Sequence, residues 1–430
     1  MSTDNNIRAW LKTTTGIVGV LILVQFLTGV LLAFYYVPSV DHAYTTVSYI
    51  EKVVSSGSWI RSLHHYGSQW LSVFVFLHVI RLFWHEGYAT NKLQWIAAIL
   101  ILGLVMAAGG TGYSLPWDAR AFFSTRVAEG LMAGLPVAGS MARLWLLGGS
   151  DISGVTLSRF FALHVLVVPA LIAAVMVWRL FRANFTEGIA ALFTTRDAIA
   201  GSVVFLALAI WALQHPAPLG PSVAEAGADY LPRPGAQFLW LYQSLKYIPG
   251  GLGSVVGVVL PGIVLALLVA LPWLKRQRLI AGSVLAIGAV LVVVMTTASY
   301  LGDRRDPKTA QQLARQAAQE DAWRRQPFQP ATITLAAATP AATGGGPPEM
   351  YTKFCAQCHG PHGEGAQQGP LRFPPLLDVP AKPRRSVDDI VSLLKDPTAY
   401  GLQPPMRSFS GKLTDEQMKE IAEWIVKLKR

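Results

Sequence analysis

The chain has 430 residues, of which 52% are hydrophobic and only 14% charged, and its formal net charge is +11. Long apolar runs in a chain of this composition indicate an integral membrane protein. The positive charge lies largely in loops and in the tail and forms no basic domain face, which argues against nucleic-acid binding.

Seven apolar runs are predicted to cross a membrane, because each is long and nearly free of charge. No small-residue cleavage site follows the first run, so we expect it to remain as an anchor and not to be removed as a signal peptide. The runs lie near residues 16–37, 66–84, 95–113, 160–178, 198–213, 252–274 and 279–301.

Basic residues flank these runs on one side of the predicted bilayer. The sequence KRQR at 275–278, together with Arg179, Arg182 and Arg196, is typical of cytoplasmic flanks under the positive-inside rule. With seven spans and a cytoplasmic N-terminus, the seventh span ends on the opposite side. We therefore predict a multi-pass protein of a bacterial-type inner (cytoplasmic) membrane with a periplasmic C-terminal part.

The second run contains histidines, which are costly among apolar residues unless they have a partner. His64 and His78 are 14 residues apart. In an α-helix this spacing is a rise of about 21 Å and brings the second side chain to within about 40° of the first. Such a pair suits two stacked haems if a second helix supplies matching ligands, and His164 in the fourth run is one candidate. The alternative is a hydrogen-bonded histidine in a helix core.

The sequence changes character after the seventh run. Residues 303–326 are charged and helix-prone, and residues 327–348 are rich in Pro, Ala, Thr and Gly, as in a flexible tether. If about 20 of these residues are unstructured, their root-mean-square reach is roughly 25 Å. A small soluble domain is predicted over residues 349–430.

The two cysteines of the chain form a C-x-x-C-H motif, which is the attachment site of a c-type haem. The spacing lets the thiols of Cys355 and Cys358 bond the vinyl groups of the haem while His359 ligates the iron. A zinc site would need two more ligands, and no further cysteine remains. We therefore predict one covalent haem c and neither a disulfide nor a second covalently bound haem.

The surroundings of this motif resemble the class I cytochromes c. The resemblance implies that Met406, in the sequence PPMRSFSG just before a helix at about 414–428, is the sixth ligand of the iron. A thioether opposite a histidine raises the haem potential. Met350 and Met418 are the rival ligands. Haem is attached outside the cytoplasm in this family, which again implies a periplasmic domain.

The sequences WIRSLHHYGS, FLHVIR, GGTGYSLPWD and LSRFFALH resemble the cytochrome b of the bc and bf complexes. The resemblance covers about residues 7–275. It implies an all-α fold, a polytopic membrane bundle of about seven helices with a haem-binding four-helix core, followed here by a tethered small α-helical cytochrome c domain. The predicted parts are a cytochrome b N-terminal-like domain, a C-terminal-like part, a charged helix with linker, and the cytochrome c domain, at 1–190, 191–302, 303–348 and 349–430.

In this family the first histidine of the second helix pairs with the first histidine of the fourth. Carried over, His64 and His164 ligate a haem b near the outer face, and His78 belongs to an inner haem b site. The neighbouring His65 is then a partly solvated interfacial residue.

Three further residues match family positions around haem b. Arg61 and Arg81 match arginines beside the haem propionates, where a guanidinium pairs well with carboxylates. Both could instead be ordinary interface anchors. Gly112 suits a close approach of its helix to the porphyrin, since no side chain intervenes.

The chain departs from the family at the inner site. The histidine expected 14 or 15 residues beyond His164 is missing, and those positions hold Trp178 and Arg179. Pro169, five residues after His164, favours the spacing of the bf branch, and this spacing singles out Arg179 as the replacement of the missing histidine. Neither an indole nor a guanidinium can ligate iron. We therefore predict one haem b with two protein ligands. The second haem b is either absent, or held by His78 alone, or ligated by another group.

A second departure lies between the fifth and sixth spans. The sequence YLPRPGAQFLWLYQSLKYIPG resembles the stretch that carries the Pro-Glu-Trp-Tyr motif of the outer quinol site, but it reads Pro234, Gly235, Ala236 and Gln237. The acid that would accept a quinol proton is missing, and so is the tyrosine. In addition, Thr13 stands where the bf branch has a cysteine for an extra inner haem.

These losses predict an oxidoreductase component of the quinol–cytochrome c reductase type without an intact Q cycle. The leading hypothesis is a membrane electron-transfer subunit of a respiratory complex, which links the quinone pool or a partner subunit to a haem b and the tethered haem c. The alternatives are a full quinol–cytochrome c reductase subunit and a non-catalytic membrane scaffold that carries only haem c. Expected partners are other subunits of a membrane complex, a separate Rieske-type iron–sulfur protein, quinone, and a soluble or membrane electron acceptor.

Overall fold

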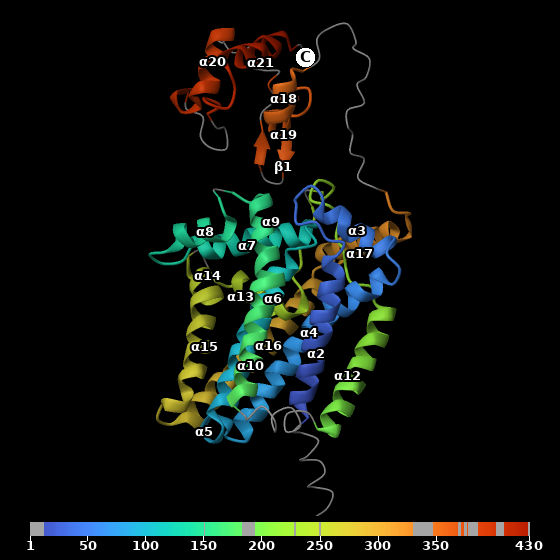
Figure 1. Cartoon of the computed structure of the whole chain (residues 1–430), viewed down its shortest axis with the longest axis vertical. Coiled ribbons are helices and arrows are strands. Elements are labelled where there is room, and N and C mark those ends of the chain that lie inside the picture. The colour runs from blue at the N-terminus through green and yellow to red at the C-terminus, as the bar shows by residue number, and fades with distance from the viewer. Residues whose placement is uncertain are drawn as a thin grey trace, which may run out of the picture. The chain divides into compact units, whose positions relative to one another are not determined.

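The computed structural model describes residues 13–149, 151–182, 194–227, 229–248, 251–329, 347–368, 371–373, 376, 386–400 and 408–428. The chain forms two compact units, Met1–Ala331 and Thr332–Arg430 (Figure 1).

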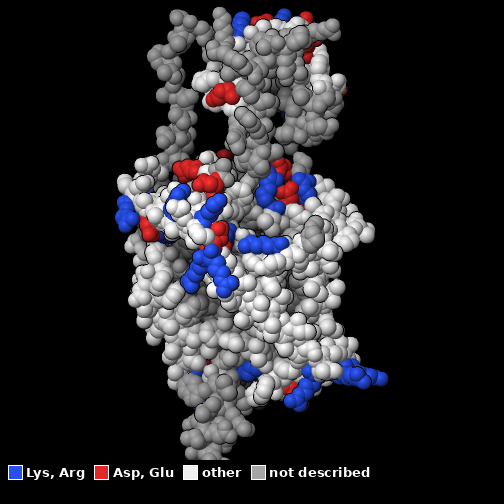
Figure 2. Space-filling model, turned by 180° about the vertical axis from the view of Figure 1, so that it is seen from behind, with Lys and Arg blue, Asp and Glu red and all other residues white. Residues whose placement is uncertain are grey.

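The first unit is a bundle of helices, and the described residues include seven that are long and apolar enough to cross a membrane. The seven predicted spans are thus confirmed. The second begins at Gly57, nine residues before the predicted start, because Arg61, His64 and His65 interrupt the apolar run without interrupting the helix. On the face shown in Figure 2, a band without charged side chains separates charged groups at the two ends of this unit, as a lipid-facing surface requires.

Five spans are single helices and two contain a π-helical turn. The single helices are α2 (Thr14–Ala33), α4 (Gly57–Trp84), α6 (Lys92–Tyr113), α12 (Thr195–Gln214) and α16 (Gln277–Arg305). The fourth span joins α9 (Gly154–Ala162), the π-turn η1 (Leu163–Val167) and α10 (Val168–Arg182). The sixth joins α14 (Leu252–Ser254), the π-turn η3 (Val255–Val259), α15 (Leu260–Ala270) and the 3-10 turn η4 (Leu271–Trp273).

The remaining elements of the first unit connect the spans. α3 and α17 lie at the end of the bundle where α2 ends (Figure 1). α17 follows α16 after Asp306 alone, and the side chain of Asp306 caps the start of α17. These connecting elements are α3 (Ala43–Lys52), α5 (Gly87–Thr90), α7 (Ala119–Ala133), α8 (Gly139–Leu147), η2 (Ala236–Phe238), α13 (Leu239–Lys246) and α17 (Pro307–Arg325).

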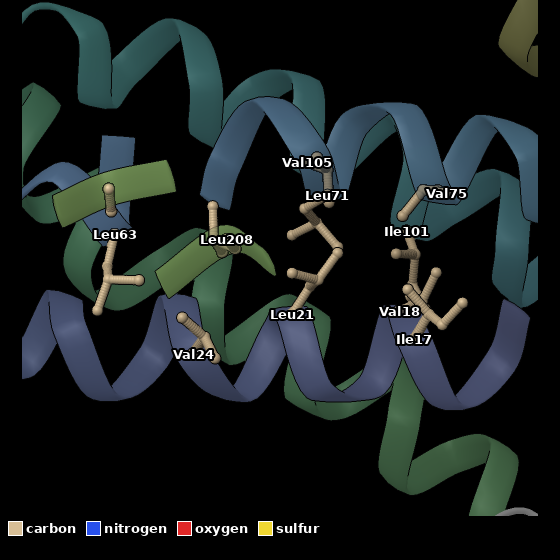
Figure 3. Close-up of a cluster of buried hydrophobic side chains, with 11 residues drawn as sticks. Ile17, Val18, Leu21, Val24, Leu63, Leu71, Val75, Ile101, Val105 and Leu208 are labelled. Carbon is tan, nitrogen blue, oxygen red and sulfur yellow. The ribbon is translucent and has the colours of Figure 1, made fainter. Parts of the chain in front are cut away.

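The core of the bundle is formed by α2, α4, α6 and α12, which pack their apolar faces together (Figure 3). Leu21 of α2 and Leu208 of α12 are completely buried there. A second cluster joins the far end of α4 to α5, α6, α15 and α16, where the indole nitrogen of Trp95 donates a hydrogen bond of 2.7 Å to the carbonyl of Leu268. This packing fixes α2, α4 and α6 side by side, and these helices carry or surround the predicted haem ligands.

The second unit is a small helical domain with one two-stranded antiparallel ribbon. α21 presents Met418, Ile421, Ala422 and Ile425 to the core, a spacing that places them on one face of the helix. The ring of Tyr351 packs against that of Trp424 at 4.3 Å between ring centroids, with the planes tilted by 49°, and so ties the first helix of the domain to the last. The elements are α18 (Glu349–Phe354), α19 (Ala356–His359), β1 (Ala366–Gln368), β2 (Leu371–Phe373), α20 (Val387–Lys395), η6 (Pro397–Tyr400) and α21 (Asp415–Lys427).

Candidate haem sites

The imidazoles of His64 and His164 face one another inside the bundle. His64 lies on α4 and His164 in the π-turn η1, and their ring centroids are 5.9 Å apart with the planes at 79°. A metal held between two imidazoles by bonds of about 2 Å separates the ring centres by roughly 6 Å. The pair, called the outer site after its predicted side of the membrane, therefore fits axial ligation of a haem iron.

Hydrogen bonds at the outer site fix which ring nitrogen is available. The hydroxyl of Thr28 donates to the carbonyl of Val24 at 2.6 Å, so its oxygen accepts from Nδ1 of His64 at 3.0 Å. Nδ1 of His164 lies 3.1 Å from the carbonyl oxygen of Ala108, which can only accept. Both rings thus carry their proton on Nδ1, and both leave Nε2 as a lone-pair donor for a metal.

Glycines flank the two rings of the outer site. A Cβ atom at Gly112 would lie 2.4 Å from Cε1 of His164, and one at Gly29 would lie 3.1 Å from Cε1 of His64. The first distance leaves no room for a methyl group. Gly112 thus lies directly against the ring of His164, and the close approach of its helix to a porphyrin remains a prediction.

His65 belongs to a different environment from its neighbour. Its Nε2 is 3.0 Å from the amide nitrogen of Gln69, one turn further along α4, and its ring meets the edge of Tyr66 at 4.9 Å between centroids. His65 is therefore engaged on its own helix, and its predicted place outside the haem ligand set remains a prediction.

The inner site, defined here by His78 and Arg179, has one histidine. His78 is 5% exposed, and its Nδ1 is 2.9 Å from the hydroxyl of Thr14 on α2. Arg179 is partly buried, whereas the adjacent Trp178 is 39% exposed on the surface of the bundle. Arg81 and Arg179 both act electrostatically on His78. Arg179, which Pro169 favours as the replacement of the missing histidine, is thus directed toward the bundle, and Trp178 is not.

Arg61 has protein partners in this structure. It is 8% exposed, its Nε donates to Glu51 at 2.6 Å, and its other nitrogens donate to the carbonyls of Ala217 and Pro218. A role of Arg61 beside a haem propionate remains a prediction. Its burial does not suit the alternative of an interface anchor.

Glu51 is the centre of a buried charge cluster. It pairs with Arg61 and also with Arg324 of α17, and its side chain is only 4% exposed. Burial acts to raise the pKa of Glu51, but the charges of Arg61 and Arg324, with hydrogen bonds from Arg61 and Ser58, outweigh it and hold that pKa below its usual range.

The same cluster fixes α17 to the bundle. Glu320 of α17 pairs with Arg120 of α7 at 2.7 Å and with Arg324 at 2.8 Å, and it accepts from the backbone of Leu219. Lys52 of α3 lies over the ring of Trp323 at 3.9 Å and donates to its carbonyl. The helix that follows the last span therefore has a defined seat on the first unit.

The segment that departs from the quinol motif lies against α6. Oε1 of Gln237 is buried and accepts no hydrogen bond from any described residue, while the ring of Tyr113 packs beside Gly235. Pro234 and Ala236 line a cavity of about 410 Å³ together with the end of α16 and the start of α17. No carboxylate stands in the motif itself, and whether quinol binds there remains a prediction.

The C-x-x-C-H motif forms one helical turn in the second unit. Cys355 is the N-cap residue of α19 and His359 is its last residue, so the backbone of the motif follows one short helical turn. Cys355 is 7% exposed, and the hydroxyl of Tyr351 donates to the carbonyl of Gly360 at 2.7 Å, which holds the end of the turn. This arrangement fits attachment of a haem through two thioethers with an imidazole ligand.

The predicted sixth ligand, Met406, lies outside the described residues. Met418 is 1% exposed in the apolar core of the domain, and Met350 packs against the same core. Among the parts of the chain that the structure describes, no group of three or more His, Cys, Asp and Glu side chains is arranged to hold a metal ion. The zinc alternative thus gains nothing from the described geometry.

Comparison with known proteins gives two family matches. The model of the family Cytochrome b/b6/petB matches residues 1–185, and the model of the family Cytochrome c matches residues 348–429. Both resemblances found in the sequence are thereby confirmed.

Individual proteins agree with these matches. The cytochrome b subunit of menaquinol:cytochrome c reductase from Bacillus subtilis (strain 168) is 38% identical over 156 residues, 36% of this chain and 70% of the relative. Cytochrome b6 of Prochlorococcus marinus (strain NATL1A) is 38% identical over 162 residues, 37% of this chain and 74% of the relative. A chain of a solved structure, "Hyperthermophilic respiratory Complex III", has the same fold with a TM-score of 0.55 at 21% identity, and the match covers 73% of this chain and 89% of that one.

Residues that orient the ligands were not found from the sequence. Thr28 and Thr14 hold the two histidines of α4, and Glu51 binds Arg61. One signal could have revealed the threonines, because they are 14 residues apart, as His64 and His78 are.

Proposed function

Because this chain belongs to the cytochrome b family, with a cytochrome c domain at residues 348–429, we propose that it is the electron-transfer subunit of a respiratory membrane complex that works without an intact Q cycle. Haem b in the membrane unit and haem c in the second unit are the carriers. Electrons pass between the quinone pool or a partner subunit, the haem b at the outer site, and the haem c on Cys355 and Cys358.

The observation that carries this proposal is the facing pair His64 and His164. Their separation of 5.9 Å and the two Nδ1 hydrogen bonds supply two oriented Nε2 ligands for one iron. Haem iron held there supplies a one-electron carrier within the membrane. The protein contributes the orientation of the ligands, the apolar walls, and the close approach at Gly112.

Two features favour a linear route over a bifurcated one. A Q cycle sends one electron outward and one inward, and the inward branch needs a second low-spin haem, for which Arg179 offers no ligand. The outward branch needs a proton acceptor at the quinol site, where the motif reads Pro234, Gly235, Ala236 and Gln237.

The placement of the molecule follows from the same reasoning. The seven spans sit in a bacterial-type inner membrane with the N-terminus in the cytoplasm and the haem c domain in the periplasm. A separate iron–sulfur subunit of the Rieske type and an external acceptor complete the complex. The Bacillus subtilis relative is named as one subunit of a menaquinol:cytochrome c reductase, which supports an assembly of several subunits.

A stopped-flow experiment on the membrane complex that purifies with the full-length chain, reconstituted in nanodiscs, tests the route. The haems are first reduced with a water-soluble naphthoquinol, ferricyanide is then mixed in, and the haem b and haem c absorbances are followed separately. A linear chain predicts that both haems become oxidised together. Cys358→Ala, which loses covalent haem c, is the matched control and should slow the oxidation of haem b.

Two results would overturn the proposal. A transient extra reduction of haem b while haem c is being oxidised would establish a bifurcating reductase. A purified protein with haem c and no haem b would establish the non-catalytic scaffold.

A further inference from the structure

The two halves of the membrane bundle present their histidines in the same way. Thr28 and Thr14 are 14 residues apart on α2, and His64 and His78 are 14 residues apart on α4. Each threonine hydroxyl contacts Nδ1 of its histidine, at 3.0 Å in the outer pair and 2.9 Å in the inner pair. His78 is therefore oriented as the haem ligand His64 is, with Nε2 left over.

Nε2 of His78 has no hydrogen-bond partner among the described residues. His78 is 5% exposed in the middle of an apolar span, and Nε2 makes no hydrogen bond with any described residue. An imidazole nitrogen without a protein partner in an apolar span is a candidate metal ligand when the proton of the ring lies on Nδ1. A metal bound at Nε2 would satisfy it.

The opposite wall of the inner site contains Arg179 because of the π-turn η1. A π-turn adds one residue to a helix, so the 15 residues from His164 to Arg179 advance like 14 residues of regular α-helix. The spacing on this helix thus equals that between His64 and His78. Since His164 faces His64, Arg179 falls opposite His78, and the exposed Trp178 does not.

The charge at this position is not neutralised within the described structure. Arg179 is partly buried and makes no ion pair or hydrogen bond with the residues described. Arg81 and Asp197 are the nearby charges, but Oδ2 of Asp197 already accepts from the backbone and hydroxyl of Thr194 at the start of α12. Among the described residues, the guanidinium of Arg179 thus keeps a positive charge without an ion-pair partner in an apolar setting, which favours an anion.

We propose that the inner site holds a haem through His78 alone and that the open face of this haem, under Arg179, binds a small inorganic anion. His78 supplies the single protein ligand, and Thr14 orients it. Arg179 supplies a charged hydrogen-bond donor for the anion where the family has a second histidine. The outer haem, with ligands on both faces, has no such position.

Azide and carbon monoxide are the probes that separate ligand binding from charge recognition. The full-length protein in nanodiscs should show a high-spin haem b signal in electron paramagnetic resonance, beside the low-spin signals of the outer haem b and haem c. Azide should convert it to low spin, and carbon monoxide should bind when it is reduced. Arg179→Gln should weaken azide binding roughly tenfold, because a charge-assisted hydrogen bond is lost, and should change the affinity for neutral carbon monoxide far less.

Register controls separate this site from a general effect on the bundle. Arg179→His should turn the high-spin haem into a second low-spin haem b without added ligand. Trp178→His, one residue away on the exposed side, should leave the high-spin signal unchanged, and so should Arg182→Gln, which removes an exposed positive charge of the same helix. His78→Ala should remove the high-spin haem and keep the outer one.

The proposal is overturned if the unmodified protein shows two low-spin b signals, if it shows no high-spin haem, or if Arg179→Gln leaves the azide affinity unchanged. It rests on the haem b assignment of the proposed function, but the two fail separately. The low-spin signals of the outer haem b and of haem c report the proposed function, and the azide-sensitive high-spin signal reports the inner site.

Discussion

Cε1 of His164 lies 2.4 Å from the point at which a side chain at Gly112 would begin. This distance is far below any real contact between carbon atoms, so the ring and a methyl group cannot both be accommodated. The backbone of α6 at Gly112 is thus part of the outer site, although it offers no ligand.

Gly112→Ala should therefore weaken haem binding at the outer site. Forcing one methyl group into a packed interior costs about 1–3 kcal/mol, which corresponds to a loss of roughly 5- to 150-fold in the binding constant. The measured quantity is the ratio of low-spin haem b to covalent haem c, determined by absorbance and electron paramagnetic resonance. Gly110→Ala is the matched control, because no heavy atom lies within 4 Å of a Cβ there. Equal haem contents in both variants would contradict the close approach at Gly112.

The ligand pair itself makes a second prediction. His164→Ala should abolish the low-spin haem b of the outer site, because one of its two ligands is lost and His65, the neighbour of His64, is engaged with Gln69. His65→Ala should retain that haem. Both variants keep the haem c signal as an internal standard. A low-spin haem b that survives in His164→Ala would show that the two rings do not share an iron.

The sequence predicts the fold and the outer ligands for different reasons. The seven spans follow from hydropathy, a local property that the bilayer imposes on each helix separately. His64 and His164 were found because their motifs resemble a family in which the pairing is known. Composition alone would not have joined two residues 100 positions apart.

The supporting contacts could not be predicted, because they join residues that no local pattern connects. Thr28 meets His64, and Glu51 meets Arg324, only after the helices have packed. Pro169 already favours Arg179 over Trp178 as the replacement of the missing histidine, but the sequence does not show the cause. The π-turn before Pro169 supplies it, since it shifts the register of the helix by one residue.

A third prediction concerns the sixth ligand of haem c. Met406→Ala should lower the haem c potential by on the order of 0.1 V, because axial ligands set haem potentials over a range of about 0.8 V. The absorption band that reports the sulfur–iron bond should disappear. Met418→Leu is the control, since Met418 is packed into the domain core and a volume-conserving change should leave potential and band intact. A band that persists in Met406→Ala but not in Met418→Leu would reverse the assignment.

The last prediction concerns the buried charge cluster that fixes α17. Glu51→Gln leaves Arg61 and Arg324 without their shared carboxylate, and breaking a buried pair in this way costs roughly 3 kcal/mol. The melting temperature should fall, and trypsin should cleave sooner after α17. Glu86→Gln is the control, because its partner Arg278 is 80% exposed and such a surface pair contributes less than about 0.5 kcal/mol.

The same cluster makes stability depend on pH with a definite sign. The pKa of Glu51 is held below its usual range in the folded protein, so folding favours the ionised carboxylate. Its contribution is complete above the ordinary glutamate pKa of about 4.3 and is lost as the pH falls through the lower folded value. The difference in melting temperature between the unmodified protein and Glu51→Gln should therefore be constant near neutral pH and shrink toward acid. A difference that grows on acidification would mean that Glu51 is protonated in the folded protein and that Arg324 is held in place by other groups.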